Sequence, residues 1–573
     1  MPSRILVLII LGFAGLLRFY HIGAYSPYTD EKFTLLNVHG ICVGGYNQPE
    51  LTDNDTFTPK EFWKDRDLDD HYQAIARSDF GTHFTYNVLL KYWIKAFGLN
   101  DGMVRTLSVL FNLLTLVLVF WLCKAFLKST NIGLTAMSII ALDPLFISQS
   151  HYARSYTLSF LLVVLGTIVF YKILKSENKK ETIKLGAFYG LIAAMALLNH
   201  YLNFIIFLAH VITAAIYLRN QRKWLILLGA GAFTLLVMGY WMTAGGGQWS
   251  MEFLKDKNSL HLKMANLPAD QNPMSGNVDP SSLKNISQKG LNVFFDSNLV
   301  SFDLYHSLHG VLNLGLFIIA SILLGLTLKF TKIKKENLLL GFFAILLVLG
   351  LVLLPSYYKL AFISAAFMLV VLYHWFMHPV EKELRLMLLL SALLPLFYVI
   401  FDAFKTGHTT SLAHRYIGVC VPFLGIIYAV GLYRLFHQKG NLKYLAIIPI
   451  AYQLFFVGEE IKQVLNDTSA RYSFRNEARE KNPYREASLL VIENYSKGDT
   501  LLIPSYGNNI YSDLRDNHGQ KNILDAQYLN LYLPKDAEYI EHIDVSEPNL
   551  LVLKKANGTR KVLFDFQGKK LRY

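Results

Sequence analysis

Apolar stretches long enough to cross a lipid bilayer recur along most of this chain, and they limit what it can fold into. A transmembrane helix needs roughly 20 consecutive, mostly apolar residues. Stretches of this kind begin near Ile5, Val104, Ile132, Tyr156, Leu185, Leu202, Trp224, Leu308, Leu338, Leu360, Leu384, Tyr416 and Leu442. Charged residues make up only 17% of the 573 residues, whereas an ordinary soluble domain has about 25%. The pattern predicts an all-α polytopic membrane protein with about 13 transmembrane helices.

The positive charge of the chain follows the predicted spans. The formal net charge is +13, which in a soluble protein would suggest a nucleic-acid partner. Here a basic loop follows each even-numbered span, and the loop after the fourth span carries Lys172, Lys175, Lys179, Lys180 and Lys184. Cytoplasmic loops are enriched in Lys and Arg. The N-terminus is therefore predicted to be cytoplasmic, and no nucleic acid is expected as a partner.

Three longer polar regions face the other side of the membrane in this topology. Residues 21–103 are predicted to form a first outer loop with interfacial helices, and residues 244–307 a second large outer loop. Residues 465–573 alternate short β-rich runs (501–503, 550–553 and 561–564) with turn signals and contain one helical stretch near Arg485 to Tyr495. This alternation predicts a small α/β domain on the outer face, after a transmembrane domain that covers residues 1–464.

Two adjacent carboxylates, Asp30 and Glu31, follow the first span. At the membrane surface such a pair could take a proton from a hydroxyl as a general base, or hold a divalent cation with its oxygens. The alternative is a helix start, with Thr29 as the N-cap and the acidic residues in the first turn, where the helix dipole favours negative charge. Both interpretations stay open, because a carboxylate at a helix start is also held rigidly.

Further polar residues lie at the outer ends of later spans. Asp79 and His83 precede an aromatic, amphipathic run that is typical of an interfacial helix, and Arg105 follows at the start of the second span. The simpler interpretation of Arg105 is a side chain that extends from its span into the interface. Arg154 lies in a short outer turn, where the positive-inside rule does not explain it, and Asp143 inside the third span could pair with Arg154 or with a substrate cation.

A last polar group precedes the twelfth span, where His408, His414 and Arg415 lie close together in the sequence. These side chains could bind a phosphate or contribute to a metal site. The simpler interpretation is that each histidine is an ordinary polar residue of the outer surface.

All of these groups face one side of the membrane in the predicted topology. Together with the interfacial aromatic residues they describe a pocket for an anionic lipid head group. The predicted phosphate contacts are Arg105, Arg154 and Arg415, because the guanidinium fork matches phosphate geometry. Further substrate or metal contacts are predicted for Asp79, His83, His408 and His414. A carboxylate would activate the acceptor, and since phosphate leaves readily, such a reaction needs a base but no general acid.

In their order and sidedness, these motifs resemble the GT-C membrane glycosyltransferases, in the branch of protein O-mannosyltransferases and lipid A aminoarabinose transferases. The matching positions are Asp30-Glu31, Asp79 with Gly81, Gly98 to Phe111, Ala141-Leu142 with Pro144, Ser150 with Ala153-Arg154 and Tyr156, Arg415-Tyr416 with Pro422, Arg485 to Ala487, and Gly498-Asp499. The resemblance covers most of residues 1–175 and weakens after them. Each motif is weak alone, and their shared order carries the resemblance.

The resemblance implies a glycosyltransferase that moves a hexose or pentose from a polyprenyl-phosphate donor to an acceptor on the outer face. It implies that Asp30 is the catalytic base, with Glu31 beside it. The acceptor would be a hydroxyl or a phosphate on a protein, on lipid A or on another glycan, and these residues do not determine the sugar. Because this family branch is common in bacteria, a multi-pass location in the plasma (inner) membrane is expected, with an extracytoplasmic C-terminal domain.

The sequence also departs from the family pattern. The family turn often reads Gln-Glu-Ala-Arg, whereas residues 151–154 read His-Tyr-Ala-Arg. Residues 82–85 replace the histidine and paired prolines that are common after the first loop. The acceptor and metal environments are therefore expected to differ from those of the family. A divalent metal ion stays open as a cofactor, and no other cofactor is predicted.

Two other functional classes fit a polytopic membrane chain: a transporter or flippase for lipids or solutes, and a membrane scaffold without catalytic activity. Transporters tend to have inverted repeats, broken helices and ionisable groups near the midplane. Here the centres of the predicted spans are almost free of charge, with Asp143 the main exception. Glycosyl transfer is therefore the favoured hypothesis. Loss of turnover in Asp30→Asn would support it, whereas transport that this substitution leaves unchanged would support a transporter.

Overall fold

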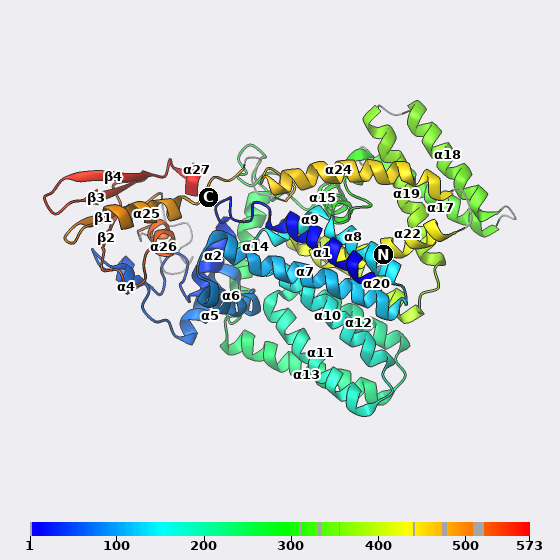
Figure 1. Ribbon diagram of the computed structural model, residues 1–573, viewed down its shortest axis with the longest axis horizontal. Helices are drawn as coiled ribbons and strands as arrows, with labels where there is room; N and C mark the ends of the chain where they lie inside the picture. Colours follow the sequence, from blue (N-terminus) through cyan, green and yellow to red (C-terminus); the bar gives the residue numbers. More distant parts are fainter. Residues whose placement is uncertain are drawn as a thin grey trace.

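The computed structural model describes residues 3–308, 311–330, 334–353, 356–438, 442–472, 478–507 and 521–572. The chain is mostly helical, with one small mixed sheet in its C-terminal part. A large helical bundle and this sheet lie at opposite ends of the long axis, and a layer of shorter helices that includes α2 (Thr29–Val38) lies between them (Figure 1). One end of the bundle therefore meets the polar part of the chain.

The apolar stretches form the helices of the bundle, and each predicted span lies in a helix or leads into one. The bounds are α1 (Ser3–Phe19), α7 (Asp101–Phe126), α8 (Thr130–Ala141), α9 (Pro144–Ser150), α10 (Tyr156–Lys175), α11 (Lys179–Asn199), η1 (Tyr201–Asn203), α12 (Phe204–Tyr217), α13 (Gln221–Ala244), α17 (Val311–Phe330), α18 (Lys335–Leu353), α19 (Ser356–Met377), α20 (Lys382–Thr406), α21 (His414–Ile417), η2 (Gly418–Cys420), α22 (Val421–His437), α23 (Leu442–Leu445) and α24 (Ile447–Leu465). Within the described residues, six helical segments are long and apolar enough to cross a membrane, or seven if a bent pair counts as one span. A multi-pass membrane protein is thus confirmed, whereas the number of about 13 spans stays a prediction.

Asparagine side chains begin three of the long helices. Asn100 precedes α7 and its side-chain oxygen accepts a hydrogen bond from the backbone N–H of Gly102. Asn178 and Asn220 cap α11 and α13 in the same way. Such caps satisfy N–H groups that have no partner within the helix. They also mark where polar loops give way to apolar helices.

The third predicted span, which starts near Ile132, is broken in the structure. Its two halves, α8 and α9, are bent by 65° relative to each other. Asp143 stands at the break, where its carboxylate accepts a hydrogen bond of 2.9 Å from the backbone N–H of Phe146, and Pro144 begins α9. Asp143 is therefore an N-cap. The expected pair between Asp143 and Arg154 is not formed, because Arg154 pairs with Asp79 instead.

Polar side chains from two neighbouring helices satisfy backbone groups around this break. Arg18 of α1 donates a hydrogen bond of 3.2 Å to the carbonyl of Ala141. Asn112 of α7 donates one of 2.8 Å to the carbonyl of Phe146, and its side-chain oxygen accepts from Arg18 Nε. A polar backbone group in a membrane needs a protein partner, because lipid tails offer none. These two side chains therefore let the span bend.

The outer layer is built from shorter helices. Those of the first outer region are α2, α3 (Pro49–Thr52), α4 (Pro59–Phe62), α5 (Leu68–Asp79) and α6 (Phe84–Phe97), and those of the second are α14 (Ser250–Ala265), α15 (Leu283–Asp296) and α16 (Leu304–Ser307). The aromatic run predicted as an interfacial helix is α6. Asp67 caps α5 by accepting from the backbone N–H of Asp70, as expected for an aspartate before an acidic first turn.

The C-terminal part holds a four-stranded sheet of order β2-β1-β3-β4, with one parallel pair. Its elements are α25 (Pro483–Asn494), β1 (Thr500–Pro504), α26 (Leu524–Asn530), β2 (Ile540–Asp544), β3 (Leu550–Lys554), β4 (Arg560–Asp565) and α27 (Lys569–Arg572). The β-rich runs and the helical stretch predicted from the sequence correspond to β1, β3, β4 and α25, whereas β2 was not predicted. In β2 the buried positions include Glu541, so the usual alternation of apolar and polar residues is absent.

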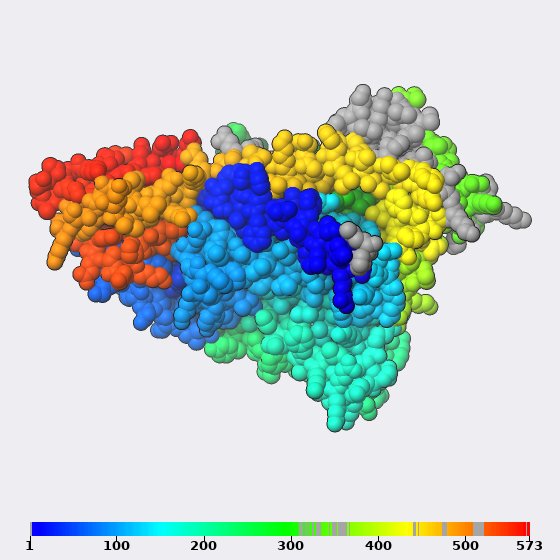
Figure 2. Space-filling model, viewed as in Figure 1, coloured from blue at the N-terminus to red at the C-terminus, as the bar shows by residue number. Residues whose placement is uncertain are grey.

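The first outer region and the C-terminal part pack against each other. The backbones of Phe57 and Glu541 exchange hydrogen bonds of 3.0 and 2.8 Å, and Trp63 donates to the carbonyl of Asn530. Figure 2 shows the C-terminal part (orange to red) lying against the first outer region (blue). The two regions, far apart in the sequence, thus form one layer over one end of the bundle.

Candidate active site

The two carboxylates singled out in the sequence lie in the first turn of α2. The helix begins at Thr29, and Tyr28 takes the N-cap position that the sequence analysis assigned to Thr29. The Glu31 carboxylate accepts a hydrogen bond of 2.8 Å from the backbone N–H of Tyr28, which closes the first turn. A negative side chain is favoured here by the helix dipole. The helix start and a functional role are therefore compatible.

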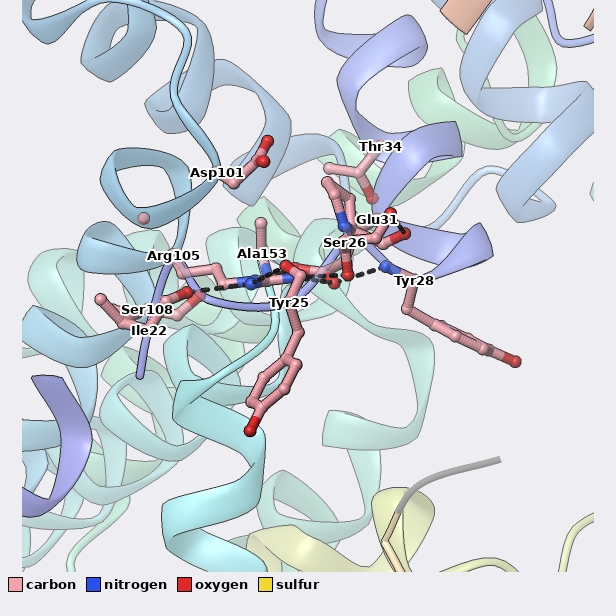
Figure 3. A network of polar contacts seen from close by, with 12 residues as sticks. Ile22, Tyr25, Ser26, Tyr28, Glu31, Thr34, Asp101, Arg105, Ser108 and Ala153 are labelled. Carbon is pink, nitrogen blue, oxygen red and sulfur yellow. Dashed lines mark hydrogen bonds and ion pairs between the residues drawn. The ribbon is translucent and has the colours of Figure 1, made fainter. Parts of the chain in front are cut away.

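Glu31 is buried and surrounded by donors (Figure 3). Its oxygens accept hydrogen bonds from Arg105 Nε and Nη2 at 2.8 and 2.9 Å, and from the backbone N–H of Ala153 at 2.8 Å. Arg479 Nη1 lies 3.4 Å from the same carboxylate. Burial raises the pKa of Glu31, but the attraction and hydrogen bonds of Arg105 outweigh it, and the pKa falls to about 2. Glu31 is thus an anchor between α2, α7 and the turn before α10 that is ionised at neutral pH.

Arg105 uses all five of its N–H groups within the protein. Besides Glu31, it donates to the backbone carbonyls of Ile22, Tyr25 and Ser26 at 2.9 to 3.0 Å. A guanidinium has five donors and no acceptor. The predicted contact of Arg105 with a donor phosphate is therefore not supported by its geometry. Arg105 instead fixes the chain between α1 and α2, immediately before the carboxylate pair.

Arg479, which was not among the predicted site residues, also contacts the Glu31 carboxylate. It pairs with Asp467 through bonds of 2.7 Å from both Nε and Nη2, and it donates to the carbonyl of Ser26 at 2.9 Å. Its guanidinium also lies over the ring of Tyr152 at 5.6 Å. The segment that leads into the C-terminal part thus reaches the base of α2. No motif surrounds Arg479, so no sequence signal marks it as a site residue.

Arg154 joins Asp79 and His83 to α2. Its Nη2 donates to Asp79 Oδ1 at 2.9 Å and to His83 Nε2 at 2.7 Å, while its Nη1 donates to Thr34 Oγ1 at 2.8 Å and to the carbonyl of Asp30 at 3.0 Å. Four of the predicted site residues therefore meet in one buried network. Both terminal nitrogens of Arg154 are occupied, so it holds the backbone of Asp30 and does not present a free fork to a phosphate.

His83 is a neutral ring within this network. Arginine can only donate, so His83 Nε2 accepts and its proton lies on Nδ1, which faces the hydroxyl of Ser155 at 2.9 Å. Burial and the positive charge of Arg154 hold the pKa of His83 well below its usual value. The backbone of His83 has a φ of 73°, which is rare for a residue with a side chain. This strain fits a residue whose ring is held in place by its surroundings.

Asp30 is the open member of the carboxylate pair. Its side chain is 33% exposed, and Asp30 Oδ2 lies 3.7 Å from Arg415 Nη1, whose side chain is 26% exposed. The backbone carbonyl of Asp30 accepts from both Arg154 and the hydroxyl of Thr34, so the residue is held while its carboxylate faces outward. A carboxylate and a cation that are both accessible can bind a polar substrate between them.

A series of aromatic rings lies between the accessible side chains of Asp30 and Arg415, called the opening below, and the buried network around Arg154. The rings of His83 and Tyr156 lie 6.2 Å apart, those of Tyr156 and His200 6.0 Å, and those of His200 and Tyr416 6.2 Å. Lys257 of α14 interacts electrostatically with Tyr416 and lies 4.5 Å from the ring centre of Phe80. Lys257 was not among the predicted site residues, because it is one of several lysines in the second predicted outer loop.

His408 and His414 lie against other parts of the second outer region. His408 is buried, and its Nδ1 lies 2.7 Å from the hydroxyl of Thr410. His414 Nε2 lies 3.4 Å from Asp296 Oδ2, a carboxylate that also accepts from Arg471. Neither histidine contacts Asp30 or Glu31 in the described interactions. Their predicted roles in substrate or metal binding therefore gain no support from these contacts.

A partly open cleft lies beside the Glu31 anchor. Its walls are His21, Tyr25, Arg105, Ser148, His151, Tyr152, Val464, Asp467, Ser469, Tyr472 and Arg479. Asp30 does not line it. The open face of Asp30 and this cleft are thus two separate surfaces, with the buried Glu31–Arg105 pair near both.

The described residues contain no group of three His, Cys, Asp or Glu side chains arranged to hold a metal ion. The acidic residues nearest to Asp30 already have cationic partners, because Glu31 pairs with Arg105 and Asp79 with Arg154. A divalent cation prefers several oxygen ligands. The described side chains therefore do not fit a metal at Asp30, and no step of the chemistry below uses one.

Residues 78–245 match the family model of dolichyl-phosphate-mannose-protein mannosyltransferase. The matched segment contains Asp79, His83, Arg105 and Arg154, and it lies between Asp30 and Arg415. The resemblance that the motifs predicted is thereby confirmed. None of the curated proteins compared with the chain matches it.

Two kinds of solved structure resemble the chain distantly. The apo oligosaccharyltransferase of Archaeoglobus fulgidus has a TM-score of 0.42 and 12% identity over 96% of this chain, and the chain spans only 62% of that protein. ArnT from Cupriavidus metallidurans bound to undecaprenyl phosphate has a TM-score of 0.36 and 11% identity, and the match covers 92% of this chain and 85% of ArnT. Identities this low do not imply a shared function.

Proposed function

We propose that this chain is a membrane glycosyltransferase that moves a sugar from a polyprenyl-phosphate donor to an acceptor at the outer face of the membrane. The family match of residues 78–245 and the multi-pass helical bundle support this class. The acceptor is a hydroxyl or phosphate of a protein, of lipid A or of another glycan. The proposed location is the plasma membrane of a bacterium, with the N-terminus in the cytoplasm and the sheet on the outer side.

One observation carries the proposal: Asp30 is an accessible carboxylate on a backbone fixed from several sides, with the accessible cation of Arg415 3.7 Å away. A base and a cation side by side suit a reaction in which a proton is removed and a phosphate leaves. The neighbouring Glu31 is buried and saturated by donors, so we assign it an anchoring role. The proposed base is therefore Asp30 alone.

In the proposed reaction, an acceptor hydroxyl attacks the anomeric carbon of the sugar. A bond forms between that carbon and the acceptor oxygen while the bond to the phosphate oxygen breaks, and its electron pair goes to the phosphate. The Asp30 carboxylate takes the hydroxyl proton. Arg415 stabilises the negative charge that grows on the departing polyprenyl phosphate. Asp30 then releases its proton to water.

Two further features suit a lipid-linked donor. Lys257 adds a second positive charge near Tyr416, beside Arg415, so two cations lie in the neighbourhood of Asp30. The apolar surfaces of the spanning helices can accommodate a polyprenyl chain, because the helix surfaces and the chain are both as apolar as lipid tails. The donor phosphate is therefore proposed to lie between Arg415 and Lys257, with the sugar toward Asp30.

The test is donor cleavage by the purified chain in lipid nanodiscs. Polyprenyl phosphates that carry mannose, glucose, galacturonic acid or aminoarabinose are incubated with mixed acceptors, and the release of free polyprenyl phosphate is measured. Mannose is the first choice, because the matching family model names it. We expect release from one donor and its loss in Asp30→Asn, while Asp69→Asn, a change at an exposed aspartate of α5, has no effect.

Release that survives in Asp30→Asn would contradict the assignment of the base. If no donor is cleaved by the parent chain with any acceptor, the proposed class is wrong. Lipid or solute transport by the same nanodisc preparation would then be measured, because a transporter or flippase is the alternative function.

A further inference from the structure

Lys32, the residue after the carboxylate pair, inserts into the C-terminal part of the chain. Its side chain is buried, and its Nζ donates a hydrogen bond of 2.7 Å to the backbone carbonyl of Arg572. The same ammonium lies 5.1 Å from the ring centre of Tyr484 and 5.2 Å from that of Tyr528. Two aromatic faces and a carbonyl form a socket that suits a cation, since the ring faces carry negative charge.

The socket is itself held by further contacts. The hydroxyl of Tyr484 donates to Asp525 Oδ1 at 2.7 Å, and the rings of Tyr484 and Tyr528 pack edge to face with centres 5.2 Å apart. Arg572 Nε lies 3.0 Å from Asp525 Oδ1. Elements α25, α26 and α27 therefore meet around Lys32. A socket built from three elements has little freedom to follow a moving side chain.

Three successive residues of α2 thus contact three different parts of the chain. Asp30 faces Arg415 near the twelfth predicted span, Glu31 binds Arg105 of α7, and Lys32 enters the C-terminal socket. Successive residues of an α-helix point about 100° apart, so these contacts surround the first turn. In Figure 1, α2 lies between the sheet and the bundle, as this arrangement requires.

We propose that Lys32 is a positioning residue, through which the C-terminal part of the chain sets the orientation of the first turn of α2 and hence of the Asp30 carboxylate. The inference rests on the proposed function only for its effect on turnover. Misplacing a reacting group by about 1 Å can cost about 100-fold in rate. Lys32 acts through α2 and does not touch the substrate.

The test compares three full-length variants. Lys32→Met keeps the length of the side chain but removes the charge, and Lys32→Arg restores a cation that can lie on the same rings. The control is Lys60→Met, because Lys60 also links the first outer region to the C-terminal part, through an exposed ion pair of 3.1 Å with Glu538. Amide hydrogen exchange of α2, α25 and α26 is measured for each variant, together with kcat and KM for the donor.

We expect Lys32→Met to speed amide exchange in both α2 and α25–α26, and to lower kcat at least about tenfold with KM changed less than about threefold. Lys32→Arg should restore most of the lost kcat, and Lys60→Met should match the parent. Protection of the α7 amides would show that Lys32→Met is folded. Such a kcat loss with rescue by arginine separates positioning from general destabilisation.

Two results would overturn the inference: parental exchange rates in Lys32→Met, or faster exchange at an unchanged kcat. If the parent cleaves no donor, the proposed function fails, and hydrogen exchange alone then decides whether Lys32 couples α2 to the socket. The failures of the two proposals are thus distinguishable.

Discussion

Asp30 and Glu31 are consecutive residues, yet 33% of the Asp30 side chain is exposed and only 1% of the Glu31 side chain. The difference comes from Arg105 and Ala153, which lie far along the chain and both donate to Glu31. A pair of carboxylates that look equivalent in the sequence is therefore divided between an accessible group and a buried anchor.

The division predicts opposite effects for two similar substitutions. Asp30→Asn should abolish turnover by about 100-fold or more and leave the thermal unfolding midpoint nearly unchanged. Glu31→Gln should lower stability by about 3 to 5 kcal/mol, because it leaves the buried Arg105 guanidinium without its counter-charge. Donor cleavage and thermal unfolding of both variants in the same detergent check this pattern. The same phenotype in both variants would contradict the division.

The Glu31 anchor also predicts a loss of stability in acid. The pKa of Glu31 is about 2 in the folded chain and about 4.5 in an unfolded one. A lowered pKa contributes stability that is complete above about pH 4.5 and is lost as the pH falls toward 2, amounting to about 3 kcal/mol. The thermal unfolding midpoint of the parent chain should therefore decrease as the pH is lowered from about 4.5 to about 2. In Glu31→Gln the acid dependence should be smaller, and an equally steep dependence would assign the acid effect to other groups.

Lys257 and Arg415 predict a salt-sensitive donor affinity. Lys257→Ala and Arg415→Ala should each raise KM for the donor about 5- to 20-fold, because each removes a charge-assisted contact with the phosphate. The effect should shrink at high ionic strength, since both groups are accessible and salt screens them. Lys255→Ala, at an exposed position on the same helix, is the matched control. An unchanged KM in Lys257→Ala would remove this lysine from the donor site.

Glu541 predicts the opposite pH dependence in the C-terminal part. Burial raises its pKa to about 8, and neither Glu541 Oε1 nor Asn530 Oδ1 has a hydrogen-bond partner among the described residues. A raised pKa contributes stability that is complete below about pH 4.5 and is lost as the pH rises through 8. Glu541→Gln should therefore stabilise the chain at pH 8, by up to about 3 kcal/mol, and change little at pH 5.

Thermal unfolding at the two pH values checks this prediction. Glu538→Gln, a change at an exposed glutamate of the same segment, serves as the control. Equal effects of Glu541→Gln at pH 5 and pH 8 would show that Glu541 is not the titrating group.

The sequence was sufficient to predict the helical membrane architecture and three of the four strands, because apolar length and alternation are local signals. It was also sufficient to gather Asp30, Asp79, Arg105 and Arg154 on one side of the bundle. It could not show which arginines are occupied. Arg105 binds three carbonyls that precede α2, and backbone groups carry no sequence signal.

The sequence also could not predict the contacts that Lys32 and Arg479 make. Both act between regions that are more than 400 residues apart, so no spacing rule connects Lys32 with Arg572 or Arg479 with Ser26. Strand β2 was missed for a related reason: the inward side chain of Glu541 breaks the alternation that marks a half-buried strand.

The break between α8 and α9 has a consequence for how the chain enters a membrane. The carbonyl of Ala141 accepts from Arg18 of α1, and that of Phe146 accepts from Asn112 of α7. Neither side chain belongs to the broken span, so the span cannot reach its final shape until α1 and α7 are beside it. The bent span therefore depends on both neighbouring helices, and replacing α1 by a generic apolar helix would remove the hydrogen bond from Arg18 to the carbonyl of Ala141.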